Sequence, residues 1–214
     1  CSKFAEEVLA PINAVGDKHG AKFNNGVVNM PPGFIEAYEK FKNAGWASIS
    51  LPSEIGGGGM PYLLSGGVLE ILCTANMAFV LGPGLSIGAI SGINEHASQE
   101  QKDKFLPNLI SGDWTGTMNL SEPQSGSDLN HLTTKAEPQD DGTYKITGTK
   151  IWIGSGEHDL SDNIVHLVLA KVPGSPEGTK GISMFIVPKY IVNDDGSIGD
   201  SNNVNCISIE EKLG

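Results

Sequence analysis

The stretch WTGTMNLSEPQSGSD, residues 114–128, marks the point at which this chain of 214 residues changes its pattern. From Trp114 to Ser121, apolar or small residues alternate with polar ones, which predicts a half-buried strand. The strand leads into a loop of hydroxyl residues with one proline and one glycine, a composition typical of a tight turn. Two interpretations stay open. In the first, the N–H and hydroxyl groups on the rim of this loop bind a ligand, either an anion or the acceptor-rich edge of a heteroaromatic ring. In the second, the loop is an ordinary turn after a strand.

Before this stretch the apolar residues have helical spacing. We predict five helices: one around Phe4–Ile12 that Pro11 kinks or delays, one from Pro32 to Gly45, one over Pro61–Leu81, one over Ser86–Glu95, and one from the Ser98 capping box to Gly112. The most apolar stretch, Tyr62–Leu85, contains Glu70 and Asn76, and we interpret it as a buried helix and not as a membrane span.

After this stretch short apolar runs and turn residues predict strands. The expected strands are Thr133–Glu137 and Thr143–Ile153 around an Asp140–Gly142 turn, then Ile164–Val172, Gly181–Val187 and Val204–Ile209. The predicted fold class is therefore α+β, with an all-helical domain (1–112) followed by an antiparallel β-barrel or sandwich (113–214). Because the chain starts without an initiator Met and stops directly after a strand, we expect a piece of a longer protein, with the β domain truncated at its C-terminal end.

Charge and cysteine content exclude several classes of protein. The net charge is −11 and arginine is absent, which argues against a nucleic-acid partner. Any bound phosphate has to rely on backbone N–H groups, hydroxyls or lysine. Three distant cysteines without a CxxC pair predict a reducing compartment, with neither a disulfide framework nor a zinc site. The expected location is the cytoplasm, with no metal and no membrane partner.

Few segments are rich enough in reactive side chains to carry chemistry. Glu157-His158-Asp159 is the one dense acid–base cluster, and a polar turn is favoured over a catalytic dyad. His166 lies in an apolar run and is interpreted as a satisfied sheet residue. The glycines 56–59 are interpreted as a flexible helix–helix connection, since no strand precedes them as in a phosphate loop. Trp152, before Gly154-Ser155-Gly156, could form a wall for a flat ring system.

Four motifs carry a resemblance across nearly the whole chain. They are Gly45–Gly57, Glu100–Trp114, Met118-Asn119-Leu120-Ser121-Glu122-Pro123-Gln124-Ser125-Gly126-Ser127-Asp128, and Ile146–Gly156 with its Lys150-Ile151-Trp152-Ile153. In this order they resemble the acyl-CoA dehydrogenase family. Within the family, the stretches Thr115–Leu120, Gly156–Leu160 and Asn163–Ala170 are similar to the branch of the 3-methylmercaptopropionyl-CoA dehydrogenases, enzymes of dimethylsulfoniopropionate catabolism.

The resemblance implies an FAD enzyme that oxidises an acyl-CoA to the 2,3-enoyl-CoA and is reoxidised by an electron-transfer flavoprotein. It implies the N-terminal helical and middle β domains without the C-terminal helical domain, a bacterial cytoplasmic location, and a homodimer or homotetramer at full length. In the family, the catalytic glutamate and the main FAD-binding arginine come after the β domain. No catalytic residue is therefore assigned in this chain, and we expect the fragment alone to be inactive.

The resemblance also implies which residues bind the cofactor. Met118, Leu120 and Ser121 would line the flavin ring, Gly126 and Ser127 would lie near the FAD phosphates, and Ser127 would also approach the CoA. Trp152, Ile153 and Gly154 would lie at the isoalloxazine edge. Gly154 stands where the family has Thr or Ser, so only its N–H or the neighbouring Ser155 could make that contact. The alternatives are an acyl-CoA oxidase, a non-catalytic flavoprotein of the same fold, such as the DNA-associated alkylation-response branch, and a stand-alone FAD- or CoA-binding module.

Overall fold

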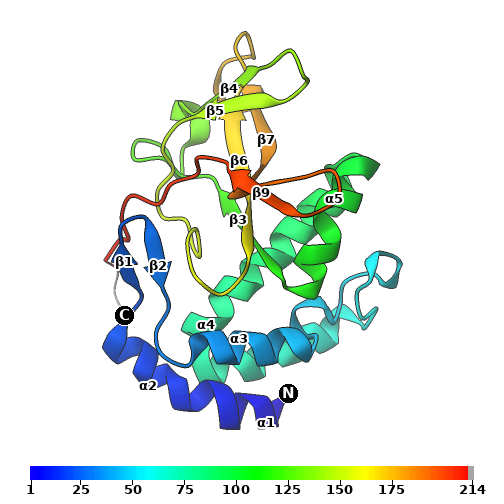
Figure 1. The fold of residues 1–214 in the computed structure, drawn as a ribbon, viewed down its shortest axis with the longest axis vertical. Helices are drawn as coiled ribbons and strands as arrows, with labels where there is room; N and C mark the ends of the chain where they lie inside the picture. Colours follow the sequence, from blue (N-terminus) through cyan, green and yellow to red (C-terminus); the bar gives the residue numbers. More distant parts are fainter. Residues whose placement is uncertain (212–214) are drawn as a thin grey trace.

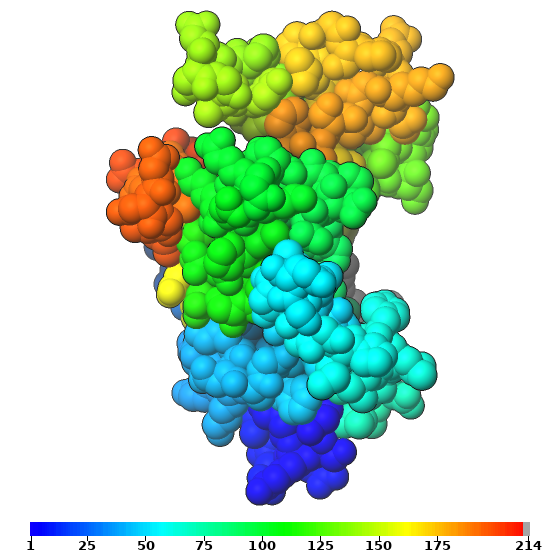
Figure 2. All heavy atoms as spheres, turned by 90° about the vertical axis from the view of Figure 1, so that its right-hand side faces the viewer, coloured from blue at the N-terminus to red at the C-terminus, as the bar shows by residue number. Residues whose placement is uncertain are grey.

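Two hydrophobic cores organise the chain, one among the N-terminal helices and one where helices meet a β-sheet. The computed structural model describes residues 1–211, so the last part of the predicted β domain, 212–214, lies outside the described residues. The N-terminal helices lie at one end of the molecule, with β1 and β2 beside them, and the strands β4, β5 and β7 lie at the other end (Figures 1 and 2).

The helical half confirms most of the expected elements. They are α1 (Ser2–Phe4), a π-helical turn (Ala5–Leu9), α2 (Ala10–His19), a small hairpin of β1 (Lys22–Asn24) and β2 (Val27–Asn29), α3 (Phe34–Asn43), two short 3-10 turns (Trp46–Ser48 and Ser53–Ile55), α4 (Tyr62–His96) and α5 (Gln99–Ser111). The chain passes Pro11 through the π-helical turn that precedes it, so the helix continues without a break. Ser98 and Gln101 form the predicted reciprocal capping box at the start of α5.

The first core is aromatic and is formed by α3 against α4. Phe34, Tyr38 and Phe41, the predicted apolar face of α3, are all buried. The ring of Phe79 in α4 packs against Phe34 at 5.8 Å and against Phe41 at 5.9 Å between centroids. Tyr38 donates a hydrogen bond of 2.8 Å to the Gly112 carbonyl and so fixes α3 to the point where the β half begins.

Helix α4 differs from the prediction of two separate helices. It runs from Tyr62 to His96, and its one break is at Asn76, with φ −162° and ψ 87°, and not between Leu81 and Ser86, where the two predicted helices were separated. The buried Asn76 side chain accepts from the Phe79 N–H at 3.0 Å and donates to the Leu9 carbonyl at 3.3 Å. An amide side chain thus takes over backbone hydrogen bonds that the break would leave unsatisfied.

The expectation of a buried helix is met on one face of α4 only. Within residues 1–211 it is the one helix long and apolar enough to cross a membrane, with a hydropathy of 1.6 over its most apolar window, of which 28% is buried. Leu63, Met77 and Leu81 are exposed. The opposite face packs on both cores, through Phe79 in one and Ile90 and Ile93 in the other. Helix α4 is therefore the common support of both halves of the described chain.

The β half forms a mixed sheet, so the predicted all-antiparallel pairing is wrong, and the described residues show no closed barrel. Its strands are β3 (Trp114–Asn119), β4 (Lys135–Pro138), β5 (Tyr144–Thr147), β6 (Asn163–Lys171) and β7 (Ile182–Pro188), with β8 (Tyr190–Val192) and β9 (Ile198–Ser201) as a separate pair. β3 runs parallel to β6, with Thr117 opposite His166, and β7 is antiparallel on the other side of β6. β4 pairs with β6 only at Lys135–Lys171, beyond the end of β3, and forms the predicted hairpin with β5.

Two predicted strands are shorter or absent. β5 ends at Thr147, so Gly148–Ile153 is irregular, and Val204–Ile209 forms no strand. Alternation of apolar residues indicates which face of a strand could be buried, but it does not supply the neighbouring strand to which the N–H and C=O groups must bond.

A close approach between β3 and α4 positions the end of β3. A Cβ atom at Gly116 would lie 2.4 Å from the Ala89 Cβ, so only glycine allows this separation. The Gly116 N–H also donates to Ser86 Oγ at 2.9 Å, although Gly116 lies within a strand. Beside this contact, Leu109 of α5, Trp114 and Val165 complete the second core.

Candidate cofactor-binding site

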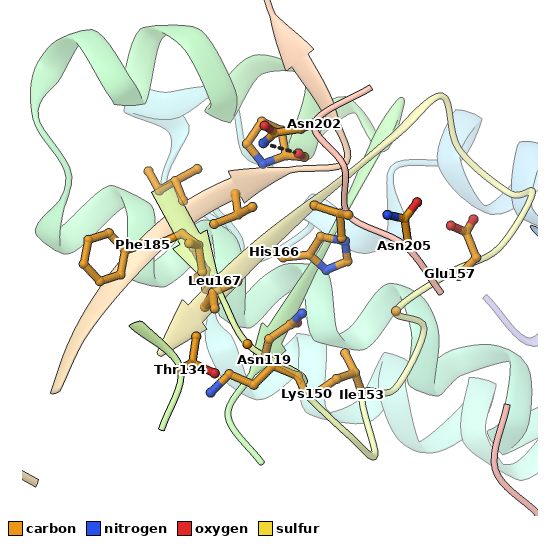
Figure 3. Close-up of a pocket in the computed structure, with 18 of the residues that line it drawn as sticks. Asn119, Thr134, Lys150, Ile153, Glu157, His166, Leu167, Phe185, Asn202 and Asn205 are labelled. Atoms are coloured by element: carbon orange, nitrogen blue, oxygen red, sulfur yellow. Dashed lines mark hydrogen bonds between the residues drawn. The ribbon is translucent and has the colours of Figure 1, made fainter. Parts of the chain in front are cut away.

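A groove of about 1900 Å³ lies along the sheet, the segment 148–158 and the segment 202–210. Figure 3 shows Lys150 and Thr134 at one end of this groove and Glu157 and Asn205 at the other. Three predicted site residues, Trp152, Ile153 and Gly154, line the groove. The other predicted residues, Met118, Leu120, Ser121, Gly126 and Ser127, do not line it; they lie at the end of β3 and on the following loop.

The two predicted halves of the site are joined by hydrogen bonds. The Ile151 N–H donates to the Ser121 carbonyl at 2.9 Å, and Lys150 Nζ donates to the Leu120 carbonyl at 3.1 Å. The structure therefore brings together the segment that ends β3 and the segment that contains Trp152. Met118, two residues before Leu120, has a side chain that is 41% exposed at this junction.

A buried carboxylate, Glu122, lies beneath this junction. Its two oxygens accept hydrogen bonds from the N–H and hydroxyl groups of both Thr133 and Thr134, at 2.5–3.0 Å, and from Gln124 Nε2 at 2.6 Å. Lys150 Nζ completes the set at 2.9 Å from Oε1. The side chains of Glu122 and Lys150 are only 1% and 9% exposed, so this is a buried and almost fully satisfied ion pair.

For each of these two groups, burial and hydrogen bonding shift the pKa in opposite directions. Burial by itself raises the pKa of Glu122, but the donors from Thr134, Thr133 and Lys150 outweigh it and hold the pKa far below its ordinary value. Burial lowers the pKa of Lys150, and Glu122 offsets part of that shift. Neither residue was a candidate in the sequence. The only signals in the sequence are their neighbours, Pro123 and Trp152, because the two charges lie 28 positions apart and nothing local indicates that they pair.

The loop after β3 is a closed turn with one exposed rim. Glu122 and Ser125 exchange backbone hydrogen bonds of 2.6 and 3.0 Å. Ser125 is buried and its hydroxyl donates to the Asp128 carbonyl at 2.7 Å, so it is not available to a ligand. Gly126 and the exposed Ser127 follow at the outer edge. Of the predicted hydroxyl rim, Ser127 and Ser121 are therefore the members that can face a ligand.

The segment from Trp152 to Ser155 has an unusual backbone and lies against α4. Trp152 and Ser155 both have left-handed backbone conformations, with φ of 62° and 52°, and half of the Trp152 side chain is exposed. A Cβ atom at Gly154 would come within 3.0 Å of Leu85 Cδ1 on α4, so a Thr or Ser there would need the end of the Leu85 side chain to move by a few tenths of an ångström. Ser155 Oγ lies over Gly82 of the same helix and is directed at α4.

The acid–base cluster at residues 157–159 is occupied by internal contacts, which favours the polar turn. Glu157 Oε1 bonds to Lys189 Nζ at 2.6 Å and accepts from the His158 N–H at 3.0 Å. Asp159 accepts from the Met30 N–H at 3.0 Å and from Asn29 Nδ2 at 3.1 Å. His158 is buried against Thr115, with 3.0 Å between Nε2 and Oγ1. No carboxylate of this cluster is left to act as a base.

His166 is buried in β6 as expected, but it is not fully satisfied. Its Nδ1 lies 2.7 Å from Thr117 Oγ1, whereas Nε2 has no hydrogen-bond partner among residues 1–211. Burial, with His158 and Lys189 nearby, lowers the pKa of His166 to about 4. Within the part of the chain that the structure describes, no group of three or more His, Cys, Asp or Glu residues could hold a metal ion.

The glycines 56–59 form the predicted helix–helix connection, but their backbone N–H groups are all hydrogen-bonded, which the expected flexible connection would not require. The N–H groups of Gly57, Gly58 and Gly59 donate to the carbonyls of Pro52, Ser48 and Leu51 at 2.9–3.0 Å. Their N–H groups are consequently not free to surround a phosphate.

Comparison with known proteins matches both halves of the chain to one family. Residues 1–113 match the acyl-CoA dehydrogenase N-terminal domain and residues 117–203 match the acyl-CoA dehydrogenase middle domain. The 3-methylmercaptopropionyl-CoA dehydrogenase of Ruegeria pomeroyi is 49% identical over 212 residues, covering 99% of this chain and 36% of the relative. The chain spans about a third of the length of the curated relatives it matches.

Two solved structures are similar in fold. The acyl-CoA dehydrogenase of Bacillus anthracis complexed with FAD has a TM-score of 0.70 at 28% identity, over 89% of this chain and 30% of that one. A structure described as the electron-transferring flavoprotein of Acidaminococcus fermentans has a TM-score of 0.70 at 28% identity, over 86% and 44% of the two chains.

Proposed function

The chain belongs to the acyl-CoA dehydrogenase family, and on that premise we propose that it forms the helical and β parts of an FAD-dependent acyl-CoA dehydrogenase. The proposed reaction is the α,β-dehydrogenation of an acyl-CoA to the 2,3-enoyl-CoA, with 3-methylmercaptopropionyl-CoA as the first substrate to test. One observation carries the proposal. The strand end at Leu120–Ser121 and the Trp152 segment meet through two hydrogen bonds and form one continuous rim beside a large groove.

The residues at this rim fit a flavin ring in size and chemistry. Met118 and Trp152 are apolar side chains with roughly half of their surface exposed, as a planar ring system requires of its walls. The Ser121 hydroxyl has no hydrogen bond within residues 1–211 and can bond a polar edge of the ring. Gly126 and Ser127 offer a small residue and an exposed hydroxyl for phosphate oxygens, in a chain without arginine.

In the proposed enzyme this chain binds and orients the cofactor and keeps water away from one face of it. FAD supplies the acceptor for the hydride that leaves the β-carbon. Leu120, Ser121, Ile153 and Gly154 would hold the ring edge, and Ser127 would contact the phosphates and the CoA. We assign the base that removes the α-proton to no residue of this chain, because Glu157 is paired with Lys189 and Glu122 with Lys150.

The partners follow from the same family. We propose an electron-transfer flavoprotein as the acceptor of the electrons, supported by the fold shared with the Acidaminococcus fermentans structure. We further propose a homodimer or homotetramer at full length and a bacterial cytoplasm as the location, in line with bacterial relatives such as that of Ruegeria pomeroyi.

The test is to express the complete reading frame and record the flavin absorbance without oxygen, before and after adding acyl-CoA substrates. Loss of the visible flavin absorbance is expected, fastest with the methylthio substrate if the branch is right. Reoxidation by electron-transfer flavoprotein, and not by dissolved oxygen, separates a dehydrogenase from an oxidase.

Two results would contradict the proposal. A protein that stays yellow with every acyl-CoA is a non-catalytic flavoprotein of this fold. A protein that is colourless and takes up no FAD shows that the Ser121–Asp128 rim and Trp152 do not form a flavin site.

A further inference from the structure

We propose that Glu122 and Lys150 are positioning residues that set the backbone of Leu120–Ser121 for the flavin, a role that rests on the proposed FAD binding. Both side chains are largely buried: Glu122, 1% exposed, lies under the rim and does not line the groove, and Lys150, 9% exposed, reaches the groove only at one end. Its effect on the cofactor would therefore be exerted through the main chain that it holds.

The carboxylate of Glu122 joins three segments that are far apart in the sequence. Its own turn follows β3, Thr133 and Thr134 precede β4, and Lys150 follows β5. Lys150 then reaches back to the Leu120 carbonyl at 3.1 Å, and the next residue, Ile151, bonds to the Ser121 carbonyl at 2.9 Å. Two successive carbonyls at the end of β3 are thus fixed by the segment that leads into Trp152.

The energetics of buried ion pairs favour a role in positioning the backbone over a role in stabilising the fold. Removing two charges from water costs several kcal/mol per ion, so such a pair contributes little net stability compared with apolar residues of the same volume. Charged residues are suited to aligning a backbone edge. A lysine can donate to a carboxylate and a carbonyl at once, and a carboxylate can accept from several N–H and hydroxyl donors.

The pair also has an electrostatic consequence that a packing role would not have. The ammonium is hydrogen-bonded to the carbonyl of a residue that would line the flavin ring, and the carboxylate lies 2.9 Å further on. With both charges present the local field largely cancels. Removing Lys150 alone leaves a negative charge near the flavin, and removing Glu122 alone leaves a positive one.

The experiment uses the full-length enzyme with the variants Glu122→Gln, Lys150→Met and the double variant. We expect each single variant to bind FAD about 10- to 100-fold more weakly, the loss typical of a hydrogen bond to a charged group. The flavin reduction potential should fall in Lys150→Met and rise in Glu122→Gln, and the double variant should lie nearer to the wild-type potential than either single variant. Lys150→Arg, which keeps the charge, should restore part of the affinity if Lys150→Met folds poorly.

Glu36 and Lys40 provide a matched control, because they carry opposite charges four residues apart on α3, both side chains are exposed, and neither lines the groove. Glu36→Gln and Lys40→Met should change neither FAD affinity nor potential. If the buried variants lower the thermal midpoint of the apoprotein but leave affinity and potential unchanged, the pair is structural and the inference is wrong. If the wild-type enzyme itself takes up no FAD, the proposed function fails, and this inference fails with it.

Discussion

Hydrogen bonds fix the proton positions of His158 at the residue scale. Its Nδ1 accepts from the Leu160 N–H at 3.1 Å, so in the neutral ring the proton is on Nε2, which faces Thr115 Oγ1. Thr115 can then donate to Ser161, and Ser161 donates to the Asn163 carbonyl at 2.9 Å. A second proton on the ring would sit on Nδ1, directly against the Leu160 N–H. The neutral ring is therefore the one that this hydrogen-bond chain accepts.

This arrangement predicts a loss of stability in mild acid. Burial, with Lys189 nearby, lowers the pKa of His158 to about 4 in the folded state, from an ordinary value of 6.5. The unfolded state thus binds more protons between these two pH values. The contribution of His158 to the free energy of unfolding, on the order of 3 kcal/mol, is fully present above pH 6.5 and is lost as the pH falls towards 4.

The measurement is the free energy of unfolding in urea across that pH range, for the wild type and His158→Gln. The variant should show a shallower dependence on pH, with the remaining slope due in part to His166. The exposed His19→Gln serves as the control. A curve for His158→Gln that runs parallel to the wild-type curve would show that His158 is not buried in its neutral form.

At the scale of elements, the separation of β3 and α4 depends on one glycine. Gly116 lies against Ala89, and its N–H is bonded to the Ser86 hydroxyl. This contact lies inside the second core, so β3 cannot move outward without opening the packing of Leu109 and Val165. The end of β3, where the predicted site begins, is positioned by this contact.

Two Gly→Ala substitutions should consequently have opposite effects. Gly116→Ala would place a methyl group 2.4 Å from the Ala89 Cβ, and we expect it to lower the free energy of unfolding by about 1–3 kcal/mol or more. Gly88→Ala, on the exposed face of the neighbouring turn of α4, meets no atom within 4 Å and should raise stability by about 0.5–1 kcal/mol. Chemical denaturation measures both, and a stable Gly116→Ala would contradict the close packing.

Local signals in the sequence were sufficient to predict helices, turns and most strands. They were not sufficient to predict which strands pair when those strands are far apart in the sequence. The capping box at Ser98 and the turn at Asp140–Gly142 depend on residues within one turn, and both are confirmed. The parallel pairing of β3 with β6 joins residues such as Thr117 and His166, which are far apart in the sequence. Alternation is the same for parallel and antiparallel neighbours, so the sequence could not indicate which of them forms.

The candidate site was predictable to a similar extent. The two segments around Ser121 and Trp152 were identified and lie together in the structure, while the cofactor contacts of their residues stay a prediction. The buried pair of Glu122 and Lys150 escaped notice because charged residues are usually exposed. Only the fold shows that both are inside. The left-handed backbone of Trp152 also has no signal in the sequence, since an aromatic residue rarely adopts it.

At the scale of the whole molecule, the segment 157–162 connects the two halves. Leu160 belongs to the aromatic core of the N-terminal helices, while Glu157 bonds to Lys189 just before β8. Asp159 holds β2 and the residue after it through Asn29 and Met30. The stretch Gly156–Leu160, one of those similar to one branch of the family, thus connects the two halves, and the Gly156 N–H also donates to the carbonyl of Ile153, a predicted flavin residue, at 3.3 Å.

Removing the Asp159 carboxylate should therefore loosen the connection without unfolding either core. Asp159→Ala leaves the Met30 N–H without its acceptor, and hydrogen bonds to a charged group contribute about 1.5–3 kcal/mol each at most. We expect faster amide hydrogen exchange at Met30 and in the β1–β2 hairpin, with unchanged protection in β6, because local opening does not require the sheet to unfold. Asp162→Ala is the matched control, since Asp162 is exposed and contributes its backbone N–H, donated to the Asp113 carbonyl at 3.1 Å. Equal acceleration in the hairpin and in β6 would show that the two halves unfold as one unit, and no change at Met30 would show that Asp159 does not hold them together.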